Sequence, residues 1–130
     1  MQHIWRSVVR DYELDLQGIV NNAVYLNYFQ NARNLQFQEV GLDWKAWHRE
    51  GRDFVLVRSE IDYKGSLREE EPFKLITTTS RVSRLRILFH QQIFSERSGK
   101  LLINGKLYGV CVDIKTGKPC VAQELVALLG

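Results

Sequence analysis

Residues 23–40 read AVYLNYFQNARNLQFQEV, and their apolar side chains recur with the spacing of a helix. The side chains that share one face at i, i+3, i+4, i+7 spacing are Tyr25, Tyr28, Phe29, Ala32 and Leu35. Asn21 or Asn22 can cap the first turn by accepting a backbone N–H, and Gly41 can end the last turn. We therefore expect a helix about 25 Å long, with the aromatic stripe in the core rather than in a substrate channel.

Strand-like runs lie on both sides of this helix. They are expected at His3–Tyr12, Phe54–Tyr63, Phe73–Val82, Leu85–Phe94 and Leu101–Asp113. Turn signals at Gly65-Ser66, near Ser83 and at Ser98-Gly99 separate the last four runs.

Two short helical segments complete the expected order of elements. One is expected from Trp44 to Glu50, capped by Asp43, and one at the tail, Ala122–Leu129. Long, consecutive antiparallel strands twist and coil, and the helix of residues 23–40 is the only long element that they can wrap. The expected fold is α+β: a five-stranded antiparallel sheet around a long central helix, in one domain over residues 1–130.

Composition excludes several classes of protein. Hydrophobic residues make up 45% and charged residues 25% of the 130 residues, which is ordinary for a globular domain. The net charge is +3, and the dispersed charges form no basic stripe with interleaved aromatics, so we expect no nucleic-acid partner. No apolar run approaches the roughly 20 residues that span a bilayer, and residues 1–6 lack the apolar core of a secretion signal. We expect a soluble, cytoplasmic protein with no membrane partner.

Most familiar catalytic patterns are absent from the sequence. There is no G-x-S-x-G elbow, and there is no G-x-G-x-x-G, P-loop or H-E-x-x-H motif. The three histidines lie far apart, and two cysteines nine residues apart, Cys111 and Cys120, support no zinc site. We expect neither a cofactor nor a metal.

Chemistry-bearing residues gather just before the long helix, in Asp15-Leu16-Gln17-Gly18-Ile19-Val20-Asn21-Asn22. Gly18 permits an unusual backbone angle or a close approach of a ligand. The start of the helix offers unpaired N–H groups and the positive end of its dipole, which suit a developing oxyanion beside a base or nucleophile. The alternative is that Asp15 or an asparagine merely caps the helix, although Asp15 lies seven residues before Asn22.

The pattern Asp15-x-x-Gly18-x-Val20-Asn21-Asn22-x-x-Tyr25-Leu26-x-Tyr28-Phe29-x-x-Ala32-Arg33 resembles the 4-hydroxybenzoyl-CoA thioesterase branch of the hotdog-fold superfamily. It is especially similar to the bacterial long-chain acyl-CoA thioesterases of that branch. Ile61-Asp62-Tyr63-Lys64 and Val110-Cys111-Val112-Asp113 extend the resemblance over nearly the whole chain.

The resemblance implies a thioester hydrolase that converts an acyl-CoA to a free acid and CoA. It makes Asp15 the catalytic carboxylate, acting as a nucleophile through a mixed anhydride or as the base for a water. Asn22 is expected to orient the water, Asp15 or the thioester, while N–H groups at the start of the helix polarise the carbonyl. The expected substrate-binding residues are Gly18, Asn21, Tyr25, Tyr63, Lys64, Arg81, Arg84 and Arg86.

The basic members of that set have two interpretations. Lys64, Arg81, Arg84 and Arg86 either contact the phosphates of CoA or belong to a solvated face of the sheet, and Arg84 and Arg86 are expected to share one strand face. The resemblance also implies homodimers that join two sheets edge to edge, often paired again to tetramers, with sites at the subunit interface.

Two other functions stay open at this point, a non-catalytic acyl-binding hotdog protein and a thioesterase for acyl-carrier protein. A hotdog hydratase would need a catalytic histidine, and none lies near Asp15 in the sequence.

Overall fold

In the computed structural model, which describes residues 1–129, the long helix α1 spans Asn22–Glu39. Asn21 caps it, because its Oδ1 accepts the N–H of Ala23 at 2.9 Å. Gly41 follows the last turn with a left-handed φ of 78°. The predicted helix is therefore confirmed to within one residue at each end.

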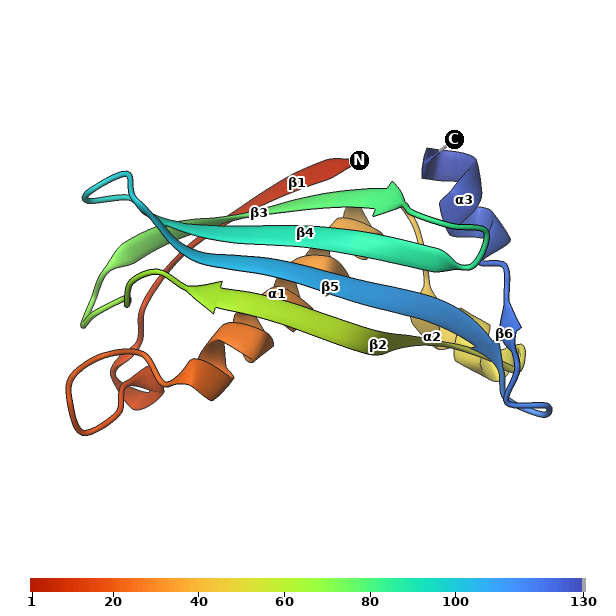
Figure 1. The fold of residues 1–130 in the computed structure, drawn as a ribbon, viewed down its shortest axis with the longest axis horizontal. Coiled ribbons are helices and arrows are strands. Elements are labelled where there is room, and N and C mark those ends of the chain that lie inside the picture. Colours follow the sequence, from red (N-terminus) through yellow and green to blue (C-terminus); the bar gives the residue numbers. More distant parts are fainter. Residues whose placement is uncertain (130) are drawn as a thin grey trace.

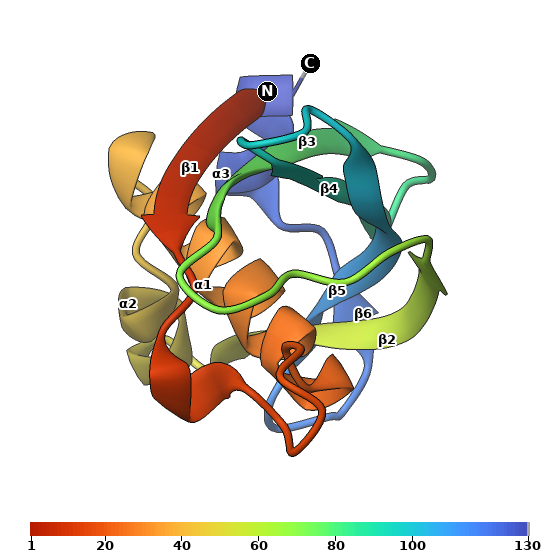
Figure 2. The same ribbon diagram turned by 90° about the vertical axis from the view of Figure 1, so that its left-hand side faces the viewer.

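A curved antiparallel sheet covers one side of α1. The five long strands are β1 (Gln2–Val8), β2 (Arg52–Tyr63), β3 (Pro72–Arg81), β4 (Arg86–Ser95) and β5 (Leu101–Asp113). Their order in the sheet is β1-β3-β4-β5-β2, so β1 and β2 form the two edges. Viewed end-on, α1 lies inside the curve of the sheet (Figure 2), which is the hotdog arrangement that the resemblance implies.

The sheet has one strand more than the five expected. The two-residue strand β6 (Pro119–Cys120) pairs antiparallel with the end of β5, opposite Cys111 and Val112. Its brevity explains why no strand pattern marks it in the sequence.

Short helices flank the sheet. They are α2 (Trp44–Arg49), the 3₁₀ turn η1 (Asp11–Glu13) and α3 (Gln123–Leu129). Asp43 caps α2 as expected, since its Oδ1 accepts the N–H groups of Lys45 and Ala46.

The first strand is shorter than predicted, because the expected strand over His3–Tyr12 stops at Val8. The Glu13 carboxylate accepts the N–H of Arg10 at 2.8 Å, and this capping interaction starts η1 in place of further strand.

The core lies between α1 and the concave face of the sheet. Residues of β3 and β4 alternate between buried and half-buried, as expected for strands with one covered face. The fully buried side chains include Phe29 on α1, Phe73 and Leu75 on β3, and Phe89 and Ile93 on β4. Each such side chain contributes roughly 1.5–3 kcal/mol by leaving water, and together they hold α1 in place. The aromatic stripe of α1 is thus confirmed as core.

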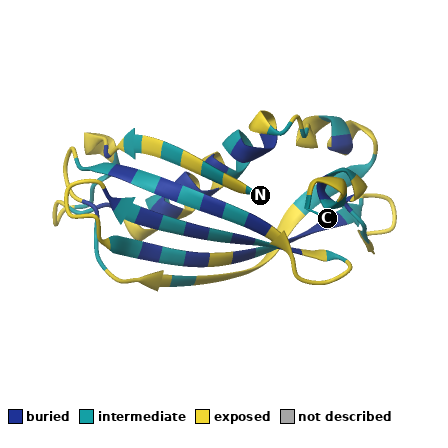
Figure 3. Ribbon diagram, turned by 90° about the horizontal axis from the view of Figure 1, so that it is seen from above, coloured by how far each residue is buried: buried dark blue, intermediate teal, exposed yellow. Residues whose placement is uncertain are grey.

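The edge strand β2 is unlike the other long strands, because residues 55–60 are exposed on both faces (Figure 3). Val55, Leu56 and Val57 are 39%, 40% and 48% exposed. A bulge falls at Val57: Leu56 pairs with Gly109 and Arg58 pairs with Tyr108, which leaves Val57 without a partner in β5. The chain therefore presents the free edge of β2, with three exposed apolar side chains, at one side of the sheet.

Among residues 1–129, no helix combines the length and the apolar character needed to cross a membrane.

Candidate active site

Asp15 occupies the first position of a tight turn between Leu14 and Val20, which form an antiparallel bridge. The N–H of Asp15 donates to the Ile19 carbonyl at 2.8 Å, and the N–H of Gly18 donates to the Asp15 carbonyl at 3.1 Å. Gly18 has a φ of 76°, the left-handed conformation that closes such a hairpin without a steric penalty. The turn thus fixes the backbone of Asp15 through contacts within a few residues.

The two carboxylate oxygens of Asp15 have different environments. Oδ1 accepts the N–H of Gln17 at 2.8 Å and the N–H of Ile19 at 3.4 Å. Oδ2 accepts no hydrogen bond from any group within residues 1–129. One oxygen therefore orients the carboxylate, and the other is available to a substrate or a water. Asp15 does not cap α1, because Asn21 does.

The start of α1 keeps one backbone donor free. Asn21 accepts the N–H of Ala23 through its side chain and the N–H of Val24 through its carbonyl. The N–H of Asn22 has no acceptor in the described part of the chain. This donor points from the positive end of the helix dipole, and the exposed Asn22 side chain lies beside it.

Two tyrosines from distant parts of the chain meet next to this turn. The ring of Tyr25 lies 6.0 Å from the ring of Tyr63 at the end of β2, and the Tyr25 hydroxyl accepts the N–H of Leu67 at 3.0 Å. Burial raises the pKa of Tyr25, and the charges of Glu71, Tyr63 and, least of all, Asp15 add to the increase. Figure 1 shows the Asp15 turn, the start of α1 and the end of β2, where Lys64 follows, at the same end of the molecule.

The three predicted arginines lie elsewhere. Arg81, Arg84 and Arg86 surround the β3–β4 turn at the opposite end of the sheet, roughly 30 Å away along a ten-residue strand. The Arg81 guanidinium donates to the carbonyls of Ser83 and Arg84 at 3.1 and 2.9 Å and so stabilises the turn. The expectation that Arg84 and Arg86 share a strand face is wrong, because Arg84 lies within the turn. Within one chain these arginines do not approach Asp15.

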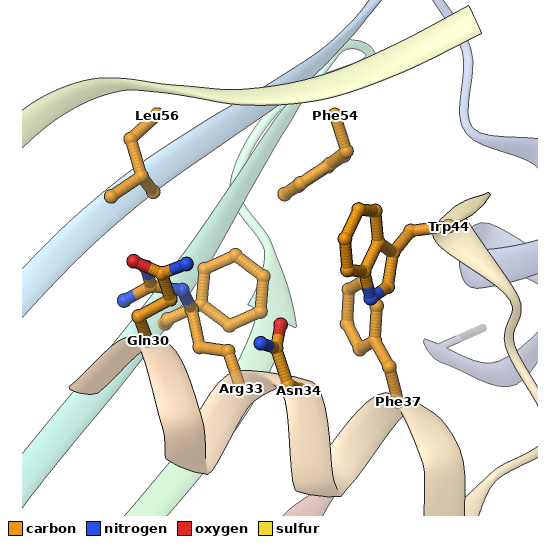
Figure 4. A pocket seen from close by; sticks show the side chains of 8 residues that line it. Gln30, Arg33, Asn34, Phe37, Trp44, Phe54 and Leu56 are labelled. Carbon is orange, nitrogen blue, oxygen red and sulfur yellow. The ribbon is translucent and has the colours of Figure 1, made fainter. Parts of the chain in front are cut away.

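A cavity of about 290 Å³ lies between α1 and β2 (Figure 4). Phe37, Trp44 and Phe54 form much of its apolar wall, and Gln30, Arg33 and Asn34 bring polar groups from α1. Its size is at the lower end of the range for ligand pockets. The arrangement can hold the body of a small, largely apolar ligand.

None of the residues that line this cavity is among the predicted site residues. Arg33 closes the motif that begins at Asp15 and has no predicted role, although it follows the buried Ala32 and lies one turn from Phe29 and from Phe37. That placement on the inner face of the helix is the sequence signal that could have identified it. The opposite wall, Phe54 and Leu56 of β2, is close to α1 only in the folded chain. Within residues 1–129, no three His, Cys, Asp or Glu residues lie close enough to hold a metal ion.

Comparison with known protein sequences identifies relatives along most of the chain. The family model described as the thioesterase-like superfamily matches residues 9–128. Acyl-acyl carrier protein thioesterase ATL2, a chloroplastic protein of Arabidopsis thaliana, is 36% identical over 122 residues, which cover 94% of this chain and 65% of that protein. The long-chain acyl-CoA thioesterase FadM of Escherichia coli is 32% identical over 115 residues, covering 85% of this chain and 83% of FadM. This chain therefore spans somewhat less than two thirds of the plant relative.

Comparison of structures supports the same architecture. A crystal structure of a 1,4-dihydroxy-2-naphthoyl-CoA thioesterase from Synechocystis superposes with a TM-score of 0.93, covering 99% of this chain and 95% of that one. The two sequences are 17% identical, so this likeness concerns the fold alone.

Proposed function

The chain belongs to the thioesterase-like superfamily, and on this basis we propose that it hydrolyses the thioester of an acyl-CoA to a free acid and CoA. The observation that carries the proposal is the Asp15 carboxylate, with Oδ1 fixed by two backbone N–H groups and Oδ2 free. The name of the relative FadM supports CoA as the carrier, and the name of ATL2 supports acyl-carrier protein as the alternative. Within the superfamily, the motif from Asp15 to Arg33 favours the 4-hydroxybenzoyl-CoA thioesterase branch.

The chemistry needs few groups. Oδ2 of Asp15 either attacks the thioester carbonyl carbon, expelling the thiolate and leaving a mixed anhydride that water hydrolyses, or takes the proton of a water that attacks the same carbon. The free N–H of Asn22 polarises the carbonyl oxygen, and the Asn22 side chain orients the water or the thioester. A thiol of pKa about 8.5 leaves as thiolate without a strong acid.

We further propose that two copies of the chain pair along β2, because its exposed apolar edge is open to a second strand. Antiparallel pairing about a two-fold axis sets the first half of one β2 against the second half of the other. The cavity beside Phe54 and Leu56 of one copy then faces the end of the second copy that carries Tyr63 and Asp15. Each site would combine a carboxylate from one subunit with a cavity from the other.

The same pairing would bring the basic residues of the two copies together. It brings the β3–β4 turn of one copy, with Arg81, Arg84 and Arg86, to the end of the second copy where Lys64 lies. Guanidinium and ammonium groups suit the phosphates of CoA.

The free thiols of Cys111 and Cys120, which face each other across β5 and β6, are consistent with a reducing, cytoplasmic setting.

The test is a thiol-release assay on a panel of acyl-CoAs and acyl-carrier proteins, with the wild type and Asp15→Asn. We expect the variant to lose at least about 100-fold in turnover, as for removal of a positioned base or nucleophile. Asparagine keeps the oxygen that accepts the N–H of Gln17, so the turn should persist. Asp11→Asn, which removes an exposed carboxylate four residues earlier, is the matched control and should retain full turnover.

Two results would contradict the proposal. Undiminished turnover of Asp15→Asn would remove Asp15 from the reaction. Failure of the wild type to release thiol from any thioester would instead favour a non-catalytic acyl-binding protein.

A further inference from the structure

A cationic side chain lies at the wall of the α1–β2 cavity without an acidic partner. Within residues 1–129, Arg33 forms no ion pair with a carboxylate. Burial lowers its pKa to about 10, which still leaves it charged at neutral pH. Removing a charge from water is costly unless the charge is paired, so this guanidinium calls for an explanation.

Two contacts hold Arg33 in one position. Its Nη1 donates to Oε1 of Gln91 at 3.0 Å, and its guanidinium carbon lies 5.7 Å from the centre of the Phe89 ring. Gln91 is fully buried, and its Nε2 donates to the Phe29 carbonyl and to Oγ1 of Thr77, both at 3.0 Å. Because the Phe29 carbonyl can only accept, the Gln91 amide oxygen has to face Arg33.

These contacts leave polar groups free toward the cavity. A guanidinium has five N–H donors, and within the described residues Arg33 uses only Nη1 in a hydrogen bond. Gln30 and Asn34, one helical turn apart on α1, form no side-chain hydrogen bond within residues 1–129. Figure 4 shows these three side chains on α1, facing Phe54 and Leu56 across the cavity.

A purely hydrocarbon acyl group would fill the aromatic part of this cavity. It would displace water from Arg33 and leave the guanidinium N–H groups without an acceptor, which is unfavourable. An acyl group with an acceptor oxygen in its body would restore the lost hydrogen bond. On the basis of the proposed thioester hydrolysis, we propose that Arg33 is a specificity-determining residue that selects acyl groups carrying a hydroxyl, keto or carboxylate oxygen away from the thioester.

The experiment compares decanoyl-CoA with a set of monohydroxylated decanoyl-CoAs that carry the hydroxyl at successive carbons, and benzoyl-CoA with its ring-hydroxylated derivatives. For the wild type we expect at least one oxygenated substrate to exceed its parent in kcat/KM by about 10- to 100-fold, the range for a charge-assisted hydrogen bond. Arg33→Met should abolish that preference while turnover of the parent persists. If Arg33 had only a structural role, Arg33→Met would lower kcat/KM equally for the oxygenated substrate and for its parent. The ratio of the two values would then stay unchanged.

Two further variants complete the design. Arg97→Gln removes an exposed arginine from the β4–β5 turn and should leave the ratio at the wild-type value. If Arg33→Met fails to fold, Asn34→Leu replaces it, since Asn34 is half-buried and makes no hydrogen bond in the described part of the chain. In that variant, the ratio of kcat/KM for the oxygenated substrate to kcat/KM for its parent should be severalfold lower than in the wild type.

The outcomes separate this inference from the proposed function. Hydrolysis by the wild type with no preference for any oxygenated acyl group, or with a preference that Arg33→Met retains, overturns the inference and leaves the hydrolase proposal intact. If no thioester is hydrolysed, the hydrolase proposal fails. Calorimetric binding of free decanoic acid and its hydroxy acids to the wild type and Arg33→Met then decides the role of Arg33, with equal affinities overturning it.

Discussion

Cys111 and Cys120 face each other across β5 and β6, yet their side chains differ in access. Cys111 is 1% exposed, and burial, together with the neighbouring Cys120 thiol, raises its pKa to about 12. Cys120 is half-buried on the short edge strand. Since the thiolate is the reactive form, a raised pKa and a covered sulfur both slow alkylation.

We predict that iodoacetamide at pH 8 modifies Cys120 at least about tenfold faster than Cys111. Peptide mass spectrometry over a time course measures both rates. Cys120→Ala should then be alkylated slowly and Cys111→Ala rapidly. Faster modification of Cys111 in the native protein would show that β6 does not cover it.

Gly105 of strand β5 has little room for a side chain between β5 and α1. A Cβ atom on Gly105 would lie 3.0 Å from Cε2 of Phe29 and 3.0 Å from Cδ1 of Leu107, tighter than ordinary contact. Because both neighbours are fully packed, a side chain here must push α1 away from the sheet or distort β5.

Gly105→Ala should therefore destabilise the protein by about 1–3 kcal/mol through overpacking, although alanine is ordinarily better than glycine in a strand. Guanidinium unfolding followed by circular dichroism measures the change. Lys106→Ala at the adjacent exposed position should change stability by less than about 0.5 kcal/mol. An unchanged unfolding midpoint for Gly105→Ala would mean that Phe29 shifts freely.

Elements with local signals could be predicted from the sequence. The period of α1, the caps Asn21 and Asp43, and the bounds of β5 all depend on residues close together in the chain. The loop that carries Asp15 has a local signal of the same kind, because its turn depends on residues 14–20.

What depends on distant contacts could not be predicted. The strand order inserts β3 between β1 and β4, and no local pattern encodes that pairing. The cavity joins α1 to β2 across the fold, and the opposite placement of Arg81 and Asp15 follows from strand direction rather than from distance along the chain.

The proposed assembly of the molecule depends on the free edge of β2. Val57 is 48% exposed at the bulge and has no partner in β5, so its substitution leaves the β2–β5 pairs in place. A lysine on an edge strand opposes pairing with a second strand by its charge and hydration.

We predict that Val57→Lys shifts the protein from dimer to monomer, as measured by sedimentation or light scattering, with thermal stability of the subunit little changed. Turnover should decrease as the fraction of dimer decreases, because the carboxylate and the cavity of each site are proposed to come from different subunits. Ile114→Lys, at a residue 44% exposed in the β5–β6 turn, is the matched control and should remain dimeric. A monomeric wild type, or a fully active monomeric Val57→Lys, would contradict the shared site.

The hydrogen bonds that orient Asp15 all come from residues 15–19, and none comes from the walls of the cavity. The proposed reactive group and the proposed specificity-determining surface thus depend on different parts of the chain. We expect substitutions on the cavity wall, at Gln30, Arg33 or Asn34 of α1, to change which molecules bind without moving the Asp15 carboxylate. A scaffold divided in this way is well suited to diversify by gene duplication, with each descendant keeping the same turn and acquiring a different preference.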